Sequence, residues 1–503
     1  MIAIIRSRKG FLLLLPYFFC CSVFLVFVRG QANVLGGLKA GKTNDGVIDD
    51  IPFTTTLSNG VEMPLVGLGV GNLHQHLVES MVNQGFNDNL RTRLIDTAHA
   101  SGNEREVARG ITTGIRDLKK ELAKKDKKNR NNKIDSKQRV QVHVVTKIWY
   151  THLGYERTKL AVDDILESFE EATKDPNVDL KLTILLHWPK CYDSIPWMNC
   201  EEEEEQLPDR IKNAGPPPHL DKENAWKGSW RALEDAYESH NLASNNNNRN
   251  QGSVIASIGI SNFSYFDLQT LLETCKITPH LAQINLWSIL NELPLIQMMD
   301  SNNIHLQVYN VMNGIIGNVI QNPKAHHHIL MVGNQLKQKY YDENAHSSSA
   351  TQNDFVMEQV LFTQVILTWL VQAHISVIPR TSDPGHLTDN SAVSLSRIPS
   401  MSKEQVEVVG KSMAAIINNE DLQDDVLLQV RFHAKESDMF LYWVPDEGDS
   451  ERQLAFIEKG SSYEESTHPG HTFKLYHAYD PDQFETFSIR GHYGEIQDIH
   501  VEL

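Results

Sequence analysis

The chain has 503 residues, 41% of them hydrophobic, and a formal net charge of −17 at pH 7. This length is too great for one ordinary hydrophobic core, so we expect two folded domains joined by connecting segments. The acidic balance argues against a surface for nucleic acid or anionic membrane, because both need clustered cationic side chains. The basic run at 119–139 contains acidic residues and no aromatic residue, and we predict a solvated helix and loop there.

Residues 1–30 have the pattern of a targeting segment: cationic residues, an apolar run at 11–28, and a small-residue cleavage context. The same run is just long enough to cross a bilayer, so an uncleaved single-pass anchor with a lumenal body remains the alternative to a signal peptide. We expect the body in the secretory pathway, in the endoplasmic reticulum lumen or secreted. Cys191 and Cys200 can then form a disulfide, or remain two unrelated thiols.

Eight strand-like segments follow a linker at 31–51. They lie at residues 64–69, 93–97, 140–148, 182–187, 257–261, 281–286, 305–309 and 376–379. Several are continuous runs of β-branched residues or leucine, which suits parallel strands buried on both faces. Helical patterns such as 224–240 and 354–373 separate them. We predict an α/β fold in which residues 52–417 form a (β/α)8 TIM barrel with its active site at the strand ends.

Polar tracts interrupt this alternation. The acidic run 201–205 and the asparagine run 245–250 cannot bury apolar area, so we predict mobile surface insertions without a function. The histidine triplet 326–328 has no carboxylate or cysteine at ligand spacing. We expect it in an exposed loop and predict no metal site.

A change of pattern marks the end of the barrel region. Ser402 and Gln405 have the spacing of a capping box, which predicts a helix beginning after Ser402. An acidic linker follows at 418–425. Short aromatic-rich strands are then expected at 426–432, 439–444, 453–457, 472–476 and 484–489. They predict a small antiparallel β-sandwich domain at 426–503.

Three barrel segments end in a reactive side chain, in the order Asp96, Lys147 and His187. A carboxylate, an ammonium and an imidazole at strand ends are the parts of a proton-relay site. Together with the motifs GISNF, AQIN, QVYN and VIPRTSDPGHLTDN, they make residues 52–415 resemble the aldo-keto reductase family. In that family a tyrosine is the acid, the lysine lowers its pKa, the aspartate holds the lysine, and the histidine orients the carbonyl. Here the tyrosine position is Ser101.

The resemblance also implies a cofactor, NADP(H), bound over the barrel mouth. The positions that would bind the nicotinamide are Ser261, Asn262, Gln283 and Tyr309, the last by stacking on its ring. The positions that would bind the adenosine 2′-phosphate and the adenine are Arg380, Thr381, Asp389 and Asn390. Arg380 suits a phosphate through paired charged hydrogen bonds. His386 stands where the family usually has a second arginine.

The implied activity is reduction of an aldehyde or ketone to an alcohol, as in aldehyde reductases and alcohol dehydrogenases. A serine hydroxyl is shorter than a phenol and titrates far above it, so Ser101 limits this expectation. Three alternatives stay open: a protonated His187 is the acid, His99 moves in as the acid, or the chain is a pseudoenzyme that binds NADPH without turnover. Val70-Gly71 and Trp287 also depart from the family pattern, so the substrate cannot be inferred.

The C-terminal strands resemble the β domain of the von Hippel-Lindau tumour suppressor, chiefly at Tyr442-Trp443 and residues 470–473. In that family a serine, a histidine and an aromatic residue recognise hydroxyproline, and Thr467, His471 and Phe473 occupy comparable positions. The resemblance implies a protein partner for this domain. The helical domain that recruits a ubiquitin ligase is not expected, and the three residues can equally be sandwich core.

Overall fold

The computed structural model describes residues 51–128, 138–192, 194–246, 254–312, 315–344, 357, 359–420, 422, 428–444, 451–467, 471–489 and 497–501. The predicted targeting segment and residues 31–50 lie outside these ranges, as does most of the asparagine run. The chain divides into two compact units: Met1–Gly314 with Leu370–Arg397, and Ile315–Trp369 with Ile398–Leu503. The predicted domain boundaries at 52–417 and 426–503 stay a prediction.

The first unit is built on eight parallel strands. They are β3 (Leu68–Gly69), β4 (Leu94–Asp96), β5 (Val140–Ile148), β6 (Val178–Leu186), β7 (Ile255–Ser261), β8 (Leu281–Asn285), β9 (His305–Tyr309) and β10 (Ser376–Val377). Each strand pairs with the next in chain order. Parallel bridges from Val66 to Val377 and from Gly69 to Arg380 return the last strand to the first. The predicted (β/α)8 architecture is confirmed.

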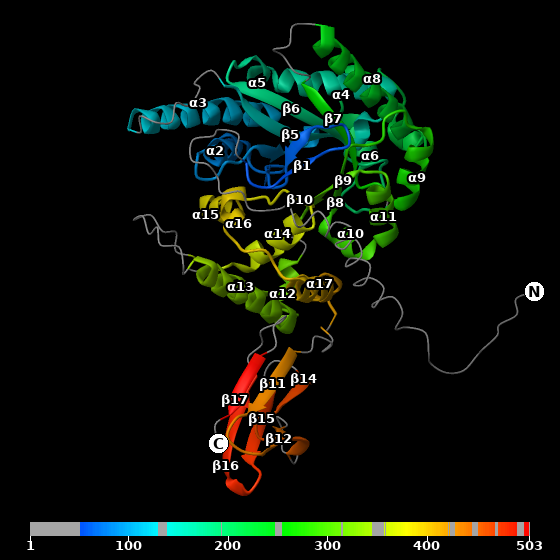
Figure 1. Cartoon of the computed structure of the whole chain (residues 1–503). Helices are drawn as coiled ribbons and strands as arrows, with labels where there is room; N and C mark the ends of the chain where they lie inside the picture. Colours follow the sequence, from blue (N-terminus) through cyan, green and yellow to red (C-terminus); the bar gives the residue numbers. More distant parts are fainter. Residues whose placement is uncertain are drawn as a thin grey trace, which may run out of the picture. The chain divides into compact units, whose positions relative to one another are not determined.

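Helices separate the strands and surround them (Figure 1). The longer ones in this unit are α2 (Gln75–Gly85), α3 (Glu104–Lys128), α4 (Tyr155–Ser168), α8 (Ala225–Asn246), α9 (Tyr265–Thr274) and α11 (Leu293–Ser301). The shorter ones are α5 (Glu170–Lys174), α6 (Cys200–Gln206), α7 (Asp209–Lys212), α10 (Leu286–Asn291), α15 (Pro384–Asp389) and α16 (Ala392–Ser396). The first part of the basic run at 119–139 lies in helix α3, as its sequence indicated.

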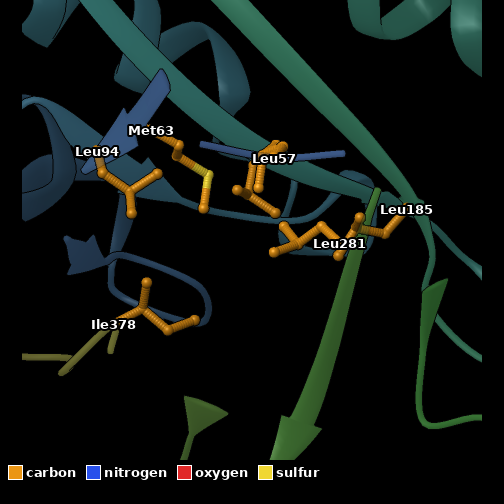
Figure 2. Packing of buried hydrophobic residues seen from close by; sticks show 7 residues of the cluster. Leu57, Met63, Leu94, Leu185, Leu281 and Ile378 are labelled. Carbon is orange, nitrogen blue, oxygen red and sulfur yellow. The ribbon is translucent and has the colours of Figure 1, made fainter. Parts of the chain in front are cut away.

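An antiparallel hairpin that the sequence did not predict precedes β3. It consists of β1 (Thr54–Thr56) and β2 (Glu62–Pro64). Its side chains Leu57 and Met63 pack with strand residues in one buried cluster, which Figure 2 shows from close by. The other members of the cluster are Leu94, Val145, Leu185 and Leu281 of the strands and Ile378, which follows β10. The hairpin therefore packs against residues of β4, β5, β6 and β8.

One glycine is required by the packing of adjacent strands. A Cβ atom on Gly259 would stand 2.1 Å from the Leu281 carbonyl oxygen and 2.7 Å from the Leu185 side chain. Backbone cannot yield that much space, so strand β7 accepts only glycine here. The middle of β7 can thereby lie close against the first residue of β8.

Two expectations for polar tracts are wrong. The acidic run lies in α6, where Glu204 is buried, because Arg157 supplies a partner that local composition cannot reveal. The histidine triplet lies in helix α13 (Pro323–Asn344), not in a loop, and His328 is buried with Ala325 and Ile329 on one face. The described residues include no group of histidine, cysteine or acidic side chains that could hold a metal ion.

The second unit contains helices and two small sheets. Its helices are α12 (Ile316–Val319), α13, most of α14 (Phe362–Gln372) and α17 (Lys403–Asn418). Helix α14 is shorter than the predicted 354–373. Helix α17 begins with the predicted capping box, in which Ser402 and Gln405 bond reciprocally. In the described part of the chain, no helix has the length and apolar character needed to cross a membrane.

The sheets have the orders β14-β11-β17 and β13-β12-β15-β16. Their strands are β11 (Leu428–Ala434), β12 (Met439–Val444), β13 (Arg452–Ile457), β14 (Ser462–Thr467), β15 (Thr472–His477), β16 (Asp480–Ser488) and β17 (Gln497–Val501). All pairs are antiparallel except β11 with β17. Phe432 of one sheet packs on Phe473 of the other, with ring centroids 5.3 Å apart. The antiparallel region was predicted, but β14 and β17 were not.

Candidate active site

The three predicted relay residues lie at the carboxyl ends of adjacent strands. Asp96 ends β4, Lys147 lies next to the end of β5, and His187 follows β6. The Lys147 Nζ donates to Asp96 Oδ1 at 2.7 Å and to the Thr97 carbonyl oxygen at 2.7 Å. Both charged groups are buried. A buried ion pair is stable only when its remaining hydrogen-bonding capacity is satisfied, and this one is closely supported.

Gln283 supplies that support from the other side of the barrel. Its Nε2 donates to Asp96 Oδ1 at 2.7 Å and to Gln307 Oε1 at 2.7 Å. All of these side chains are buried, and Gln307 Nε2 has no partner among the described residues. The carboxylate of Asp96 therefore belongs to a continuous polar network that spans β4, β5, β8 and β9.

The surroundings of His187 favour its neutral form. Burial, and then the positive charge of Lys147, lower the pKa of His187 well below its ordinary value. Its Nδ1 is buried and has no hydrogen-bond partner in the described structure, and its ring lies edge-on to Trp149 with centroids 4.9 Å apart. This environment disfavours the predicted alternative in which a protonated His187 is the acid.

Ser101 lies in the 3-10 helix η1 (His99–Ser101) and is partly exposed. Its Oγ is 3.6 Å from the position that a Cβ atom on Gly71 would occupy. Two small residues thus adjoin where the resembled family has large aromatic ones. The ring of His99 lies against His152, with centroids 4.9 Å apart, and burial lowers its pKa.

The predicted nicotinamide-binding residues form one hydrogen-bonded group. Asn262, which has a left-handed backbone with φ 58°, donates from Nδ2 to the His187 carbonyl oxygen at 2.9 Å and to Ser261 Oγ at 3.1 Å. The Tyr309 hydroxyl donates to Asn262 Oδ1 at 2.5 Å, and burial raises the pKa of Tyr309 to about 12. Gln283 joins this group to the relay. Clustered amide and hydroxyl groups fit a carboxamide, which needs both donors and acceptors.

The predicted phosphate-binding loop carries charged side chains of both signs. Arg380 is exposed and donates to the Gly71 carbonyl oxygen at 3.3 Å, while Thr381 is buried. Asp383 caps helix α15 by accepting from the His386 backbone N–H at 2.9 Å, and such backbone hydrogen bonds lower the pKa of Asp383. Asp389 and Asn390 end the same helix. The segment 380–390 offers one arginine to a phosphate, opposed by the two carboxylates Asp383 and Asp389.

Sequence reasoning missed several residues of this region. Asn103 accepts from the Thr97 hydroxyl and donates to the Val70 carbonyl oxygen, so it links the loops after β3 and β4. Glu203 accepts from the Trp149 indole N–H at 2.6 Å. Asn103 follows the relay motif within a few residues, so proximity was a usable signal. No comparable signal identified Glu203.

The structure joins Cys191 and Cys200 in a disulfide, with Cα atoms 6.2 Å apart. This separation lies within the range that a disulfide requires. Cys275 is free. The bond closes a short loop immediately after the strand end that carries His187.

The chain is similar in sequence to known oxidoreductases. A sequence model described as "Aldo/keto reductase family" matches residues 74–411. An uncharacterised oxidoreductase of Bacillus subtilis is 24% identical over 343 residues, which cover 67% of this chain and 86% of that protein. An NAD(P)H-dependent D-xylose reductase of Kluyveromyces lactis is 25% identical over 341 residues, covering 67% and 86%. A crystal structure of an aldo/keto reductase from Brucella melitensis aligns over 72% of this chain and 99% of its own, at 19% identity and a TM-score of 0.43.

Proposed function

The chain belongs to the aldo/keto reductase family of oxidoreductases, and from this premise we propose that it uses NADP(H) to reduce a small aldehyde or ketone to the alcohol. The observation that carries the proposal is the buried contact of Lys147 with Asp96, extended through Gln283 to the nicotinamide-binding group. A purely structural ion pair would not need this extension to the amide and hydroxyl groups of Asn262, Ser261 and Tyr309.

When bound, NADPH supplies the hydride that the carbonyl carbon accepts. Neutral His187 then orients the carbonyl by donating a hydrogen bond to its oxygen. The alkoxide that forms needs a proton, which a serine hydroxyl is too weak an acid to supply. We infer that the proton comes from Lys147 through a water molecule beside Ser101. The ammonium uses two donors on Asp96 and Thr97, which leaves its third N–H for this transfer.

This mechanism has a slow proton step. Removing a positioned general acid typically costs about 10²–10⁴-fold in rate. We therefore expect weak turnover from a site whose other parts are intact. Because Ser101 is not one of the predicted cofactor-binding residues, we expect NADPH binding to be independent of Ser101.

The test measures NADPH binding by fluorescence and NADPH oxidation with a panel of aldehydes. Binding with slow oxidation is expected. We expect Ser101→Tyr to raise kcat by about 10²–10⁴-fold, while Ser101→Ala leaves kcat unchanged because water supplies the bridge. Binding without any oxidation, in both the native chain and Ser101→Tyr, would sink the enzymatic proposal.

That outcome would favour the second candidate function, an NADP(H)-binding pseudoenzyme that acts through protein contacts of its C-terminal strands. The small residues Ser101 and Gly71 side by side favour it. We propose, by resemblance to the von Hippel-Lindau β domain, that Thr467 and His471 recognise a protein partner. The hydrogen bond between Thr467 Oγ1 and His471 Nδ1, 3.0 Å long, supports a defined site there. Retained binding of a hydroxyproline peptide by Thr467→Ala would contradict it.

We also propose a secretory location, in the endoplasmic reticulum lumen or outside the cell, or anchored by the N-terminal segment with the body lumenal. The Cys191–Cys200 disulfide supports an oxidising compartment. Mass spectrometry of the mature protein decides between cleavage near Gln31 and an intact N-terminus. A reduced pair of cysteines in the isolated native protein would argue against this location.

A further inference from the structure

Gln283 and Gln307 lie opposite each other on adjacent strands of the barrel. The register of β8 and β9 pairs them directly, and both side chains are buried. Gln283 Nε2 donates to Gln307 Oε1 at 2.7 Å. Gln283 also reaches Asp96 of β4, a strand that is not a neighbour of β8 in the sheet, so these side chains point into the barrel. Gln307 precedes Tyr309 by two residues, which places both on the same side of β9.

The orientation of both amides follows from the charge of Asp96. Its carboxylate accepts from the Lys147 ammonium and from Gln283 Nε2, each at 2.7 Å. Turning the Gln283 amide over would place its oxygen against the carboxylate, and two acceptors repel each other. Turning the Gln307 amide over would place its NH2 group against the NH2 group of Gln283, and two donors cannot bond. One arrangement therefore satisfies the row of side chains, and the charged relay dictates it.

This arrangement uses both hydrogens of the Gln283 amide. One hydrogen goes to Asp96 and the other to Gln307, so Gln283 can offer a ligand only its oxygen, an acceptor. The same arrangement leaves Gln307 Nε2 buried without a partner among the described residues. Buried donors of this kind are rare because they destabilise the fold. Holding Gln283, and not stabilising the barrel, is therefore what Gln307 does in this position.

We propose that Gln307 is a positioning residue for the nicotinamide site: by accepting the second N–H of Gln283, it restricts Gln283 to accepting from the cofactor. The inference rests on the proposed function, because it needs a nicotinamide cofactor beside Gln283. An acceptor recognises the amino group of the carboxamide and not its oxygen. A fixed acceptor discriminates against a ligand that lacks the matching donor, because the acceptor is then left unpaired. Gln307 thus sets, through Gln283, which substituent on the pyridine ring the chain accepts.

The experiment measures the affinity of the full chain for NADP⁺ and for two of its analogues by calorimetry. The thionicotinamide analogue keeps the amino group, whereas the 3-acetylpyridine analogue has a methyl group in its place. We expect the thionicotinamide analogue to bind within about threefold of NADP⁺, and the acetylpyridine analogue to bind at least about tenfold more weakly, as for one lost hydrogen bond to a fixed partner.

Two substitutions of Gln307 separate the acceptor from the shape of the side chain. Gln307→Met has a similar length and no acceptor, so it frees one N–H of Gln283 to donate to the acetyl oxygen. The preference for NADP⁺ over the acetylpyridine analogue should then fall to about threefold or less. Gln307→Glu keeps an oxygen that accepts from Gln283 and should keep the native preference. An unchanged preference in Gln307→Met, or an equal loss in Gln307→Glu, would overturn the inference.

The control for a merely structural effect is Leu306→Ala, in the same strand. Leu306 is buried and lies on the opposite side of β9 from Gln307. The change should lower the midpoint of urea denaturation and leave the ratios of the three affinities as they are in the native chain. The same shift of these ratios in Leu306→Ala as in Gln307→Met would show that any disturbance of β9 produces it, and would also overturn the inference.

A measurement without cofactor tests the contact itself. Urea denaturation of Gln283→Met, Gln307→Met and the double variant should give non-additive changes, because the two amides bond to each other. Additive changes would refute the role of Gln307 even in a chain that binds NADP⁺. Binding with the expected discrimination but without aldehyde-dependent oxidation would count against the proposed reductase activity alone. Failure of the native chain to bind NADP⁺ would overturn the proposed function and, with it, the cofactor role of Gln307.

Discussion

Charged pairs are buried in the barrel, whereas those of the C-terminal strands lie at the surface. In the barrel, the pairs Lys147–Asp96 and Arg157–Glu204 are buried, and several histidines are buried as well. In the C-terminal sheets, Arg431 pairs with Glu464 at the surface, and His433 pairs with Asp498 there. A buried polar group is costly when its partner is lost, whereas an exposed one is rehydrated. Changes of charge should therefore be severe in the barrel and mild in the C-terminal strands.

Acidification is expected to produce the largest difference in stability between the two regions. Burial is the first cause that lowers the pKa of His143 to about 3, and of His152 and His280 to about 4. His280 Nδ1 also accepts from the Ile258 backbone N–H, which requires a neutral ring. The unfolded chain takes up these protons near pH 6.5, so the stability is present above that pH and is lost as pH falls. At pH 5 the three residues together lower the free energy of unfolding by roughly 6 kcal/mol.

Hydrogen exchange of the full chain at pH 7 and pH 5, corrected for intrinsic rates, measures this effect by region. The barrel strands should lose protection while β12 and β15 keep theirs. His143→Met should reduce the loss by about 2 kcal/mol, whereas the surface change His433→Gln should not alter it. Equal loss of protection in both regions would show that buried histidines are not the cause.

The next largest effect is expected from Arg157→Met. The change leaves the buried Glu204 carboxylate unpaired and deprives the Thr151 and Gly215 carbonyl oxygens of their donor. Breaking a buried ion pair in this way costs about 3–5 kcal/mol. The control Arg431→Met removes an exposed ion pair and should lower the stability much less than Arg157→Met does. Urea denaturation measures both, and similar costs for the two would contradict the comparison.

Lys147→Met should abolish the residual turnover and cost about 3 kcal/mol of stability. The stability cost is smaller than for Arg157 because Gln283 still donates to Asp96. Lys181→Met is the control, since Lys181 pairs with Asp179 near the start of β6 and lies outside the site. Aldehyde-dependent NADPH oxidation by both variants measures the difference. Full activity of Lys147→Met would mean that the relay assignment is wrong.

The barrel strands could be predicted because their apolar runs are continuous and bounded by turns. Residues 140–148 and 305–309 were predicted with the bounds that the structure gives. Strands β14 and β17 were missed because their sequences, SYEEST and QDIHV, are mostly polar. Both lie at the edges of a small sheet, where solvent-facing side chains carry little hydrophobic pattern.

The residues of the site could likewise be predicted only where a local sequence pattern marks them. Asp96, Lys147 and His187 stand in motifs at strand ends, so their mutual approach followed from the parallel topology. The parts played by Gln307 and Glu203 depend on partners far away in sequence, Gln283 and Trp149. A hydrogen bond of this kind leaves no local pattern. Helix α6 was mistaken for a mobile insertion for the same reason.

The smallest predicted effect concerns the exposed charges of the barrel, which should behave like those of the C-terminal strands. Asp383→Asn removes the carboxylate three residues after Arg380, and an amide oxygen can still cap helix α15. We expect NADPH to bind about 3–10-fold more tightly while NADH affinity is unchanged, because an exposed charge is partly screened by water. Fluorescence titrations at low and high salt measure it, and the gain should shrink at high salt through screening. Asp482→Asn, an exposed change in β16, is the matched control. An unaltered NADPH to NADH ratio in Asp383→Asn would mean that this carboxylate does not oppose the phosphate.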